Sequence, residues 1–467
     1  MINYTATYTD LYQLTMSQVY FLKGQKDNQA VFDYFFRKLP FNTGYAVFAG
    51  LEDLLNVLEF LTFDKQDLDF LKGKGFHPEF IRYLKKFRFM GNLYTSCEGD
   101  IVFPTSPILQ VEANIIEAQI IETLLLNILN FQTLIATKAS RIRQAAGERK
   151  LIDFGLRRAQ GAGGYYASRA AFIGGFDATS NVRAGRDYGI PLSGTMAHSF
   201  VESYDDELTA FSHFAEEQPE NCVFLVDTYD TIKSGLPNAI TVAKKMEEKG
   251  YRLSGIRIDS GDLAYLAKEC RKSLDNSGLD YVKITVSNQL DEYIIKSLLE
   301  QQAPIDIFGV GTSLVTGHPD AALDGVYKLS FANGKPRIKL SENVSKITLP
   351  HRKQVFRMLD NGGMFTGADV ITLADEKDVD IMYHPLNPLK SLSVKKFNKE
   401  SLLQKVMGNG VRLSKLQSLT EIAQYSRERL KKLPEEYKRF NYPHIYKVGL
   451  SDRLKNERDR LIEVHKK

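Results

Sequence analysis

Residues 223–262 read VFLVDTYDTIKSGLPNAITVAKKMEEKGYRLSGIRIDSGD, and they contain two short apolar runs on either side of a segment of helical length. Each run ends in a polar turn that begins with an aspartate, Asp227 in the first and Asp259 in the second. Short apolar runs that alternate with amphipathic helices are typical of parallel strands buried on both faces. This stretch therefore predicts a strand, a crossover helix and a second, parallel strand.

The same rhythm continues on both sides of this stretch. KLIDFGLRR at 150–158 comes before it, and VKITVSNQ at 282–289 and IDIFGVGTS at 305–313 come after it, with segments of helical length between the strands. A series of this kind forms either a barrel or a doubly wound sheet. The reactive side chains follow the strands directly, and the carboxyl ends of barrel strands are where active sites lie. We therefore expect an α/β barrel.

The segments outside this series have a different pattern. Up to residue 112, helical stretches mix with strands, which indicates an α+β cap. After residue 325 the strands have the pattern of antiparallel hairpins, with Asn333-Gly334 as a turn signal, and suggest a return to the cap. We expect an N-terminal α+β cap over 1–135, the barrel domain over 136–330, and a return to the cap with C-terminal helices over 331–467.

The composition excludes several classes of protein. The 467 residues are 43% hydrophobic and 25% charged, as in ordinary globular domains, and the net charge of +4 is too small for a nucleic-acid footprint. Cys97, Cys222 and Cys270 are too widely spaced for a thiolate zinc site, and the first residues lack the pattern of a signal peptide. We therefore expect a cytoplasmic protein with neither a nucleic-acid nor a membrane partner.

A glycine-containing turn follows the last strand of the series. Gly309 and Gly311, with the Thr312 hydroxyl, can form an anion nest for a phosphate monoester, and the loops after late barrel strands are a recurrent phosphate site. The alternative is a tight turn that needs glycine at positive φ. The position at the end of a strand favours the phosphate.

Three other turns carry charged residues. Arg257 and Asp259 leave an apolar strand together, which suits an anion, a sugar hydroxyl or Mg²⁺, although a structural salt-bridge cluster is the alternative. Asp227 and Asp230 can bind a metal and a ribose, or cap the next helix. His198 follows a Gly/Thr turn, and a lone histidine is more often a surface or core residue than a functional one.

The first strand of the series ends in DFGLRR. Asp153 with Arg157 and Arg158 can form a structural ion pair or a basic wall for a pyrophosphate. Together the strand ends imply a phosphorylated sugar with further negative charge as the ligand. Hydride transfer and serine acyl transfer are disfavoured, because no G-x-G-x-x-G follows the first strand and no G-x-S-x-G is present.

The segments TDLYQLTM, DFGLRRAQG, SGTMAHSF, VDTYDT, IRIDSGD and GVGTS, in this order, resemble the nicotinate phosphoribosyltransferase family from Thr9 almost to the C-terminus. The resemblance implies an irregular α/β barrel of the nicotinate/quinolinate phosphoribosyltransferase type with a discontinuous α+β cap, and a homodimer with shared active sites. It also implies a ligase-class reaction of NAD salvage. In that reaction nicotinate and 5-phosphoribosyl 1-pyrophosphate give nicotinate mononucleotide and pyrophosphate, with Mg²⁺ present and ATP hydrolysis coupled to turnover.

The resemblance further implies roles for individual residues. His198 matches the histidine that ATP phosphorylates, and Asp227 and Asp259 would lie near it, near the ribose hydroxyls or near Mg²⁺. For nicotinate, the implied residues are Tyr12 (from the neighbouring subunit), Phe154, Ser180, Thr195 and Arg257. For the phosphoribosyl donor, they are Arg157, Gly309, Gly311 and Thr312.

Two alternatives lie within the same fold, and one lies outside it. Nicotinamide-using relatives carry an aspartate near the ring carboxamide, where this chain has the neutral Ser180, so we favour the acid as substrate. A quinolinate enzyme should show extra basic residues for a second carboxylate and no phosphorylated histidine. A non-catalytic nucleotide-binding protein would need all of these turns to be structural.

Overall fold

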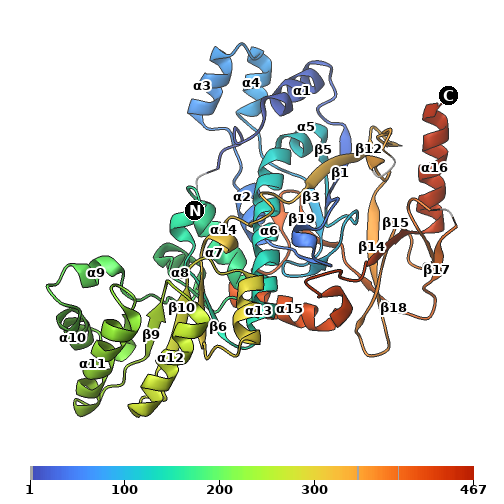
Figure 1. Cartoon of the computed structure of the whole chain (residues 1–467). Helices are drawn as coiled ribbons and strands as arrows, with labels where there is room; N and C mark the ends of the chain where they lie inside the picture. Colours follow the sequence, from blue (N-terminus) through green and yellow to red (C-terminus); the bar gives the residue numbers. More distant parts are fainter. Residues whose placement is uncertain (1–3, 344–345, 388, 467) are drawn as a thin grey trace. The chain divides into compact units, whose positions relative to one another are not determined.

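The computed structural model describes residues 4–343, 346–387 and 389–466 (Figure 1). The contacts within the chain divide it into two compact units. Unit 1 comprises Met1–Thr137 together with Ala322–Lys467, and unit 2 comprises Lys138–Ala321. Unit 1 is therefore discontinuous in sequence, as expected for the cap. Our finer domain limits at residues 135 and 330 stay predictions.

Unit 2 contains a six-stranded parallel sheet in the order β7-β6-β11-β10-β9-β8. The strands are β6 Lys150–Asp153, β7 Ala178–Thr179, β8 Val223–Leu225, β9 Gly255–Ile258, β10 Lys283–Ser287 and β11 Ile307–Val310. The first and last strands of the series pair with each other, with Phe308 opposite Leu151. The series therefore curls back on itself, and its open side is bounded by β7 and β8. The irregular α/β barrel is confirmed.

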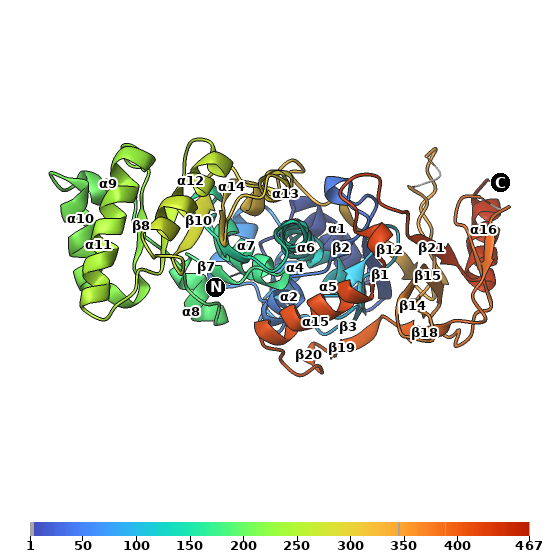
Figure 2. The ribbon, with the colours of Figure 1, turned by 60° about the horizontal axis from the view of Figure 1, so that its bottom comes forward.

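Helices follow the strands of unit 2. They are η2 Leu156–Arg158, α7 Gly163–Ile173, α8 Val182–Tyr188, α9 His198–Glu202, α10 Glu207–Glu217, η3 Pro219–Asn221, η4 Thr231–Gly235, α11 Leu236–Glu248, α12 Leu263–Asn276, α13 Glu292–Glu300 and α14 Thr312–Val315. Figure 2 shows α9, α10 and α11 grouped beside β8. Helix α12 is typical, because it buries Ala267, Cys270 and Leu274 while the Asp262 carboxylate caps its N-terminus.

Unit 1 has a seven-stranded antiparallel sheet in the order β13-β12-β1-β5-β3-β19-β20. Its strands are β1 Gln29–Phe36, β3 Asn92–Thr95, β5 Leu109–Asn114, β12 Gly325–Ala332, β13 Lys335–Pro336, β19 Gln404–Gly408 and β20 Val411–Arg412. Strands β12 and β13 join through Asn333-Gly334, both at positive φ, as the turn signal predicts. The helices around this sheet are α1 Leu11–Leu22, η1 Pro40–Asn42, α2 Leu51–Leu58, α3 Lys65–Gly73, α4 Pro78–Leu84, α5 Ile115–Ile120 and α6 Glu122–Ala146, which runs on into unit 2.

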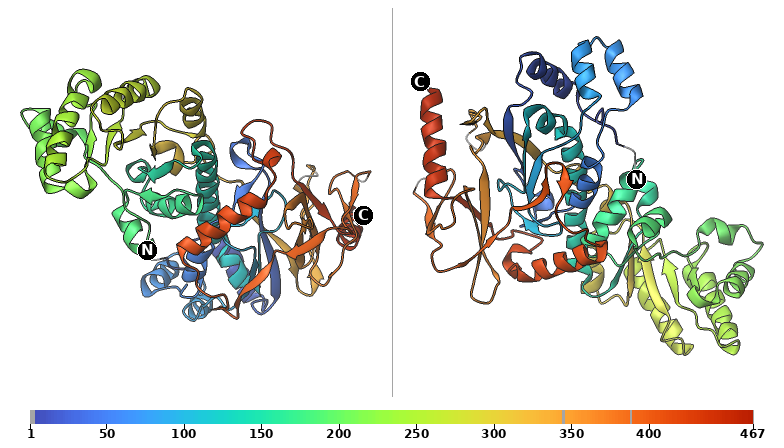
Figure 3. Two further views of the ribbon diagram at one scale, coloured as in Figure 1. Left: turned by 90° about the horizontal axis from the view of Figure 1, so that it is seen from below. Right: turned by 180° about the vertical axis from the view of Figure 1, so that it is seen from behind.

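Unit 1 also contains a six-stranded sheet in the order β17-β16-β21-β15-β14-β18, so β21 and β15 are its central strands. In Figure 3 this sheet lies in the orange to red part of the ribbon, next to the red C-terminal helix. Its strands are β14 Lys353–Leu359, β15 Phe365–Leu373, β16 Ile381–Tyr383, β17 Ser391–Ser393, β18 Asn398–Ser401 and β21 Lys447–Leu450. The short pair β2 Ala46–Val47 and β4 Ile101–Val102, with helices α15 Leu419–Lys432, η6 Glu435–Tyr437 and α16 Asp452–Lys466, makes up the rest. Across the described ranges, no helix is long and apolar enough to cross a membrane.

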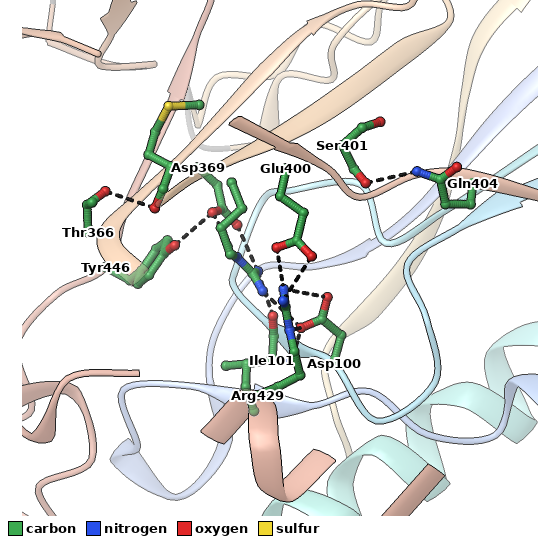
Figure 4. A network of polar contacts seen from close by, with 11 residues as sticks. Asp100, Ile101, Thr366, Asp369, Glu400, Ser401, Gln404, Arg429 and Tyr446 are labelled. Atoms are coloured by element: carbon green, nitrogen blue, oxygen red, sulfur yellow. Dashed lines mark hydrogen bonds and ion pairs between the residues drawn. The ribbon is translucent and has the colours of Figure 1, made fainter. Parts of the chain in front are cut away.

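A buried polar network joins distant segments of unit 1 (Figure 4). Asp100 accepts hydrogen bonds from Arg357 at 2.9 Å and from Arg429 at 2.8 Å. Arg357 also makes two hydrogen bonds to Asp369, while Arg429 makes two to Glu400. The network therefore ties the N-terminal part of the cap to its returning C-terminal part.

Candidate active site

The carboxyl ends of β6, β9, β10 and β11 carry polar and aromatic residues. Because these parallel strands are neighbours in one sheet, their ends meet at one edge, which we call the rim. Phe154 follows β6, Arg257 and Asp259 lie at the end of β9, and Ser287 and Gly309 belong to β10 and β11. The rim is the candidate active site.

Arg257 contacts several other residues of the rim. Its Nη1 donates to Thr195 Oγ1 at 3.2 Å, its Nε to Ser287 Oγ at 2.9 Å and its Nη2 to Asp259 Oδ1 at 3.1 Å. The guanidinium carbon lies 5.1 Å from the centroid of the Phe154 ring, within cation-π range. Three of the predicted nicotinate residues, Phe154, Thr195 and Arg257, therefore lie together, and the side chain of Arg257 is 13% exposed.

The other two predicted nicotinate residues are placed differently. Ser180 follows β7, and both its N–H and its hydroxyl donate to the Asp153 carbonyl oxygen, at 2.9 and 3.1 Å. Tyr12 lies on α1 of unit 1 and is half-exposed. Its expected place against the ring stays a proposal.

His198 begins helix α9 and faces two carboxylates. Its Nδ1 lies 3.2 Å from Thr228 Oγ1, while its Nε2 lies 3.9 Å from Asp227 Oδ1 and 4.0 Å from Asp259 Oδ2. The three residues that we predicted as catalytic, His198, Asp227 and Asp259, therefore form one cluster. His198 is also accessible, since its side chain is 38% exposed.

Asp227 is the most buried member of this cluster, with a side chain only 2% exposed. Its Oδ2 accepts hydrogen bonds from Asp259 N at 2.9 Å and from Ser260 Oγ at 2.6 Å. Its Oδ1 has no hydrogen-bond partner within the part of the chain that the structure describes. A buried, unpaired carboxylate oxygen is costly, so this atom is suited to a protonated imidazole or a cation.

Asp230 and Asp153 have structural contacts instead. The Asp230 carboxylate accepts hydrogen bonds from the N–H groups of Ile232 and Lys233, so it caps η4. Helix capping was the structural alternative to metal or ribose binding for this residue. The buried Asp153 carboxylate accepts from Gly155 N, Ser168 Oγ and Thr179 Oγ1 at 2.7 to 2.8 Å. Burial raises the pKa of Asp153, and these hydrogen bonds partly offset the effect.

The structural ion pair considered for Asp153 is wrong, because no arginine contacts this carboxylate in the described ranges. Arg157 and Arg158 instead lie on the short helix η2 and are exposed. Neither pairs with a carboxylate of any described residue. Their guanidinium groups are therefore available to an anion in solution.

The first glycine of GVGTS has a packing role that the sequence did not reveal. Neither Gly309 nor Gly311 is at positive φ, so the alternative of a positive-φ turn is wrong. Gly311 nevertheless lies at φ −118° and ψ −96°, outside the regions that other residues adopt. A Cβ on Gly309 would lie 2.4 Å from the Phe154 ring, so the missing side chain lets that ring pack against the rim. Thr312 is exposed at the start of α14, directly after Gly311.

Ser287 is the rim residue to which the sequence analysis assigned no role. Its position at the end of a predicted strand was the available signal, but serine is common at such positions and nothing in the sequence shows its partners. No three His, Cys, Asp or Glu side chains of the described residues come together as a metal site. At the rim, the carboxylates of Asp227 and Asp259 both lie within 4.0 Å of His198 Nε2.

Solved structures define the class of this protein. Human nicotinic acid phosphoribosyltransferase superimposes with a TM-score of 0.87 at 32% identity, covering 97% of this chain and 99% of that one. The nicotinate-nucleotide pyrophosphorylase of Pyrococcus furiosus superimposes with a TM-score of 0.72 at 27% identity, covering 91% and 95%. The barrel and its rim are those of a phosphoribosyltransferase.

Sequence comparisons define the family. The models of the nicotinate phosphoribosyltransferase N-terminal domain, family and C-terminal domain match residues 7–130, 149–384 and 352–458. Nicotinate phosphoribosyltransferase of Bacillus subtilis is 45% identical over 98% of this chain and 95% of its own length. The enzyme of Caenorhabditis elegans is 37% identical over 96% and 91%. The chain belongs to the nicotinate phosphoribosyltransferase family.

Proposed function

We propose that this chain joins nicotinate to 5-phosphoribosyl 1-pyrophosphate, forming nicotinate mononucleotide and pyrophosphate in NAD salvage, and that ATP hydrolysis through His198 is coupled to the reaction. The main supporting observation is the arginine-aromatic pair at the rim, Arg257 over Phe154, next to a histidine that faces two aspartates. An aromatic ring and an adjacent cation suit a planar, anionic pyridine substrate.

Each nicotinate residue has a distinct task in this proposal. Phe154 stacks on one face of the pyridine ring, and Tyr12 of a neighbouring subunit stacks on the other. Arg257 donates hydrogen bonds to the carboxylate, Thr195 accepts from Arg257 Nη1 beside it, and the neutral Ser180 avoids repelling the carboxylate. Holding the ring in this way aims its weakly nucleophilic nitrogen at the anomeric carbon of the donor. This arrangement requires a homodimer with shared active sites.

The donor is held from the other side of the reacting bond. Gly309, Gly311 and Thr312 bind its 5-phosphate through backbone N–H groups and a hydroxyl. Bond breaking gives the ribose oxocarbenium character and leaves negative charge on the pyrophosphate. Arg157 draws that charge away, which favours departure of the leaving group.

Mg²⁺ and ATP fit the cluster around His198. Magnesium prefers oxygen ligands and is commonly held by one or two carboxylates together with substrate phosphates and water. The unpaired Oδ1 of Asp227 and the Oδ2 of Asp259 supply such carboxylates within 4.0 Å of His198 Nε2. The metal would neutralise phosphate charge there. His198 accepts the γ-phosphoryl group of ATP, and the added charge reorganises the donor site.

Product analysis tests the proposed function. The purified chain is incubated with the donor and Mg²⁺, with nicotinate or nicotinamide, and with or without ATP. We expect nicotinate mononucleotide and pyrophosphate with nicotinate, more of both with ATP, and little nicotinamide mononucleotide. Preferential use of nicotinamide would establish the alternative function, a nicotinamide phosphoribosyltransferase. If neither nicotinate mononucleotide nor nicotinamide mononucleotide forms, both functions are contradicted.

Ser180→Asp tests acid-amide discrimination. The new carboxylate would repel nicotinate but can accept a hydrogen bond from the amide of nicotinamide. We expect the ratio of kcat/KM values to move towards nicotinamide by at least about tenfold, or 1.4 kcal/mol. Ser180→Ala is the matched control and should move the ratio far less. A ratio that Ser180→Asp leaves unchanged would place this residue away from the ring.

Thr312→Val tests the phosphate site. Valine keeps the shape but removes the hydroxyl, so the donor should bind more weakly by about 1 to 3 kcal/mol while the KM for nicotinate stays nearly constant. Thr241→Val is a matched control, because the Thr241 hydroxyl donates to the Pro237 carbonyl within α11. An unchanged KM for the donor in Thr312→Val would exclude the hydroxyl from donor binding.

A further inference from the structure

Ser287, the last residue of β10, connects two groups of the rim. It is 3% exposed. Its hydroxyl oxygen accepts a hydrogen bond from Arg257 Nε at 2.9 Å, and its O–H donates to Asp259 Oδ1. A hydroxyl has one proton to donate and two lone pairs, so both contacts are satisfied at once. The same Asp259 oxygen also accepts from Arg257 Nη2 at 3.1 Å.

These contacts restrict the Arg257 guanidinium. Nε–H and one Nη2–H are directed to Ser287 and Asp259, and Nη1 donates to Thr195. Of the five N–H groups of an arginine, two remain without a protein acceptor in the described part of the chain. Two fixed N–H donors on a planar group suit a carboxylate.

The backbone around Ser287 supports a functional role. Asn288 and Gln289 follow at φ values of 82° and 49°, a left-handed conformation that non-glycine residues adopt at a cost. Backbone strain of this kind clusters at active sites and ligand clamps. Leu290, which is 1% exposed, anchors the end of this turn, and Ser287 pairs with Gly309 of β11. Ser287 is therefore held at the rim from both sides.

We propose that Ser287 is a positioning residue for nicotinate recognition, which holds the Arg257 guanidinium so that its two unpaired N–H groups meet the substrate carboxylate above Phe154. This inference rests on the proposed function. Without the hydroxyl, Arg257 keeps its charge but loses one of the contacts that orient it. Removal of the Ser287 hydroxyl should therefore weaken the binding of an anionic ring substrate more than the binding of a neutral ring substrate or of the donor.

The test is a double-mutant cycle on nicotinate affinity. We expect Ser287→Ala to weaken nicotinate binding, measured as a Kd by calorimetry, by about tenfold, as for a lost hydrogen bond to a charged group. The kcat/KM ratio of nicotinate to nicotinamide should fall similarly, while the donor KM stays within about twofold. Ser277→Ala is the control, because that hydroxyl only donates to the Ser273 carbonyl at the end of α12.

In an Arg257→Ala background, Ser287→Ala should change the Kd by less than about twofold, because its effect passes through the arginine. An equal loss of nicotinate affinity in the wild-type and Arg257→Ala backgrounds, or no loss in either background, would overturn the role of Ser287. Ser287→Cys, which nearly keeps the volume but weakens the hydrogen bond, should shift the Kd in the same direction if the alanine variant does not fold. A wild-type chain that makes no nicotinate mononucleotide would instead overturn the proposed function, and this inference with it.

Discussion

His198→Ala is expected to lower the rate of ATP hydrolysis by about a thousandfold or more, which is the usual effect of removing an enzyme's nucleophile. Some phosphoribosyl transfer should persist, since in the proposed reaction the imidazole takes no part in the bond that forms. Incubation with Mg-ATP should give the wild-type chain one acid-labile, base-stable phosphate per subunit and give the variant none. Phosphate release and protein-bound phosphate measure the two effects.

The surroundings of His198 explain why this phosphate should be short-lived. Its ring lies beside Asp227 and Asp259, so an added phosphate would carry about two further negative charges into an acidic cluster. Such repulsion would favour hydrolysis of the phosphohistidine. His213→Ala, on α10, is the matched control and should keep the full ATPase rate. An unaltered ATPase rate in His198→Ala would refute the phosphohistidine.

Arg357→Met is expected to lower the free energy of unfolding of unit 1 by about 3 to 5 kcal/mol, the usual cost of breaking a buried ion pair from one side. Arg357 is fully buried. Burial opposes its charge, but Asp369 and Asp100 outweigh that effect and hold the pKa of Arg357 well above its ordinary value. Methionine would leave Asp100 beside Arg429 and Asp369 beside the Tyr446 hydroxyl, with both carboxylates still buried. Chemical denaturation followed by circular dichroism measures the loss.

An exposed ion pair of the same unit is the control for this variant. Arg453 contacts Asp375 at 2.9 Å, and their side chains are 54% and 70% exposed. Arg453→Met should therefore cost only about 0 to 1 kcal/mol, because water already screens the pair. Equal losses in the two variants would mean that the buried network contributes no more than a surface contact.

Much of the candidate site was predictable from local patterns. Asp227 follows an apolar run, Arg257 and Gly309 lie near the ends of such runs, and parallel strands place these positions at one edge. His198 was different, because the local pattern left it more often a surface or core residue, and only the resemblance assigned it a role. Ser180 and Tyr12 could not be placed by pattern, since one lies in a loop and the other in unit 1.

By itself, the sequence determined the alternation of strands and helices, the split of the cap and the residues that end each strand, because periodicity and turn chemistry act over a few neighbouring residues. Only the tertiary structure decided that β6 pairs with β11, that Gly309 makes room for Phe154 and that Ser287 joins Arg257 to Asp259. It also decided that Asp100 meets Arg357. These contacts depend on strand register and side-chain direction between segments far apart in the chain, and no local pattern encodes either.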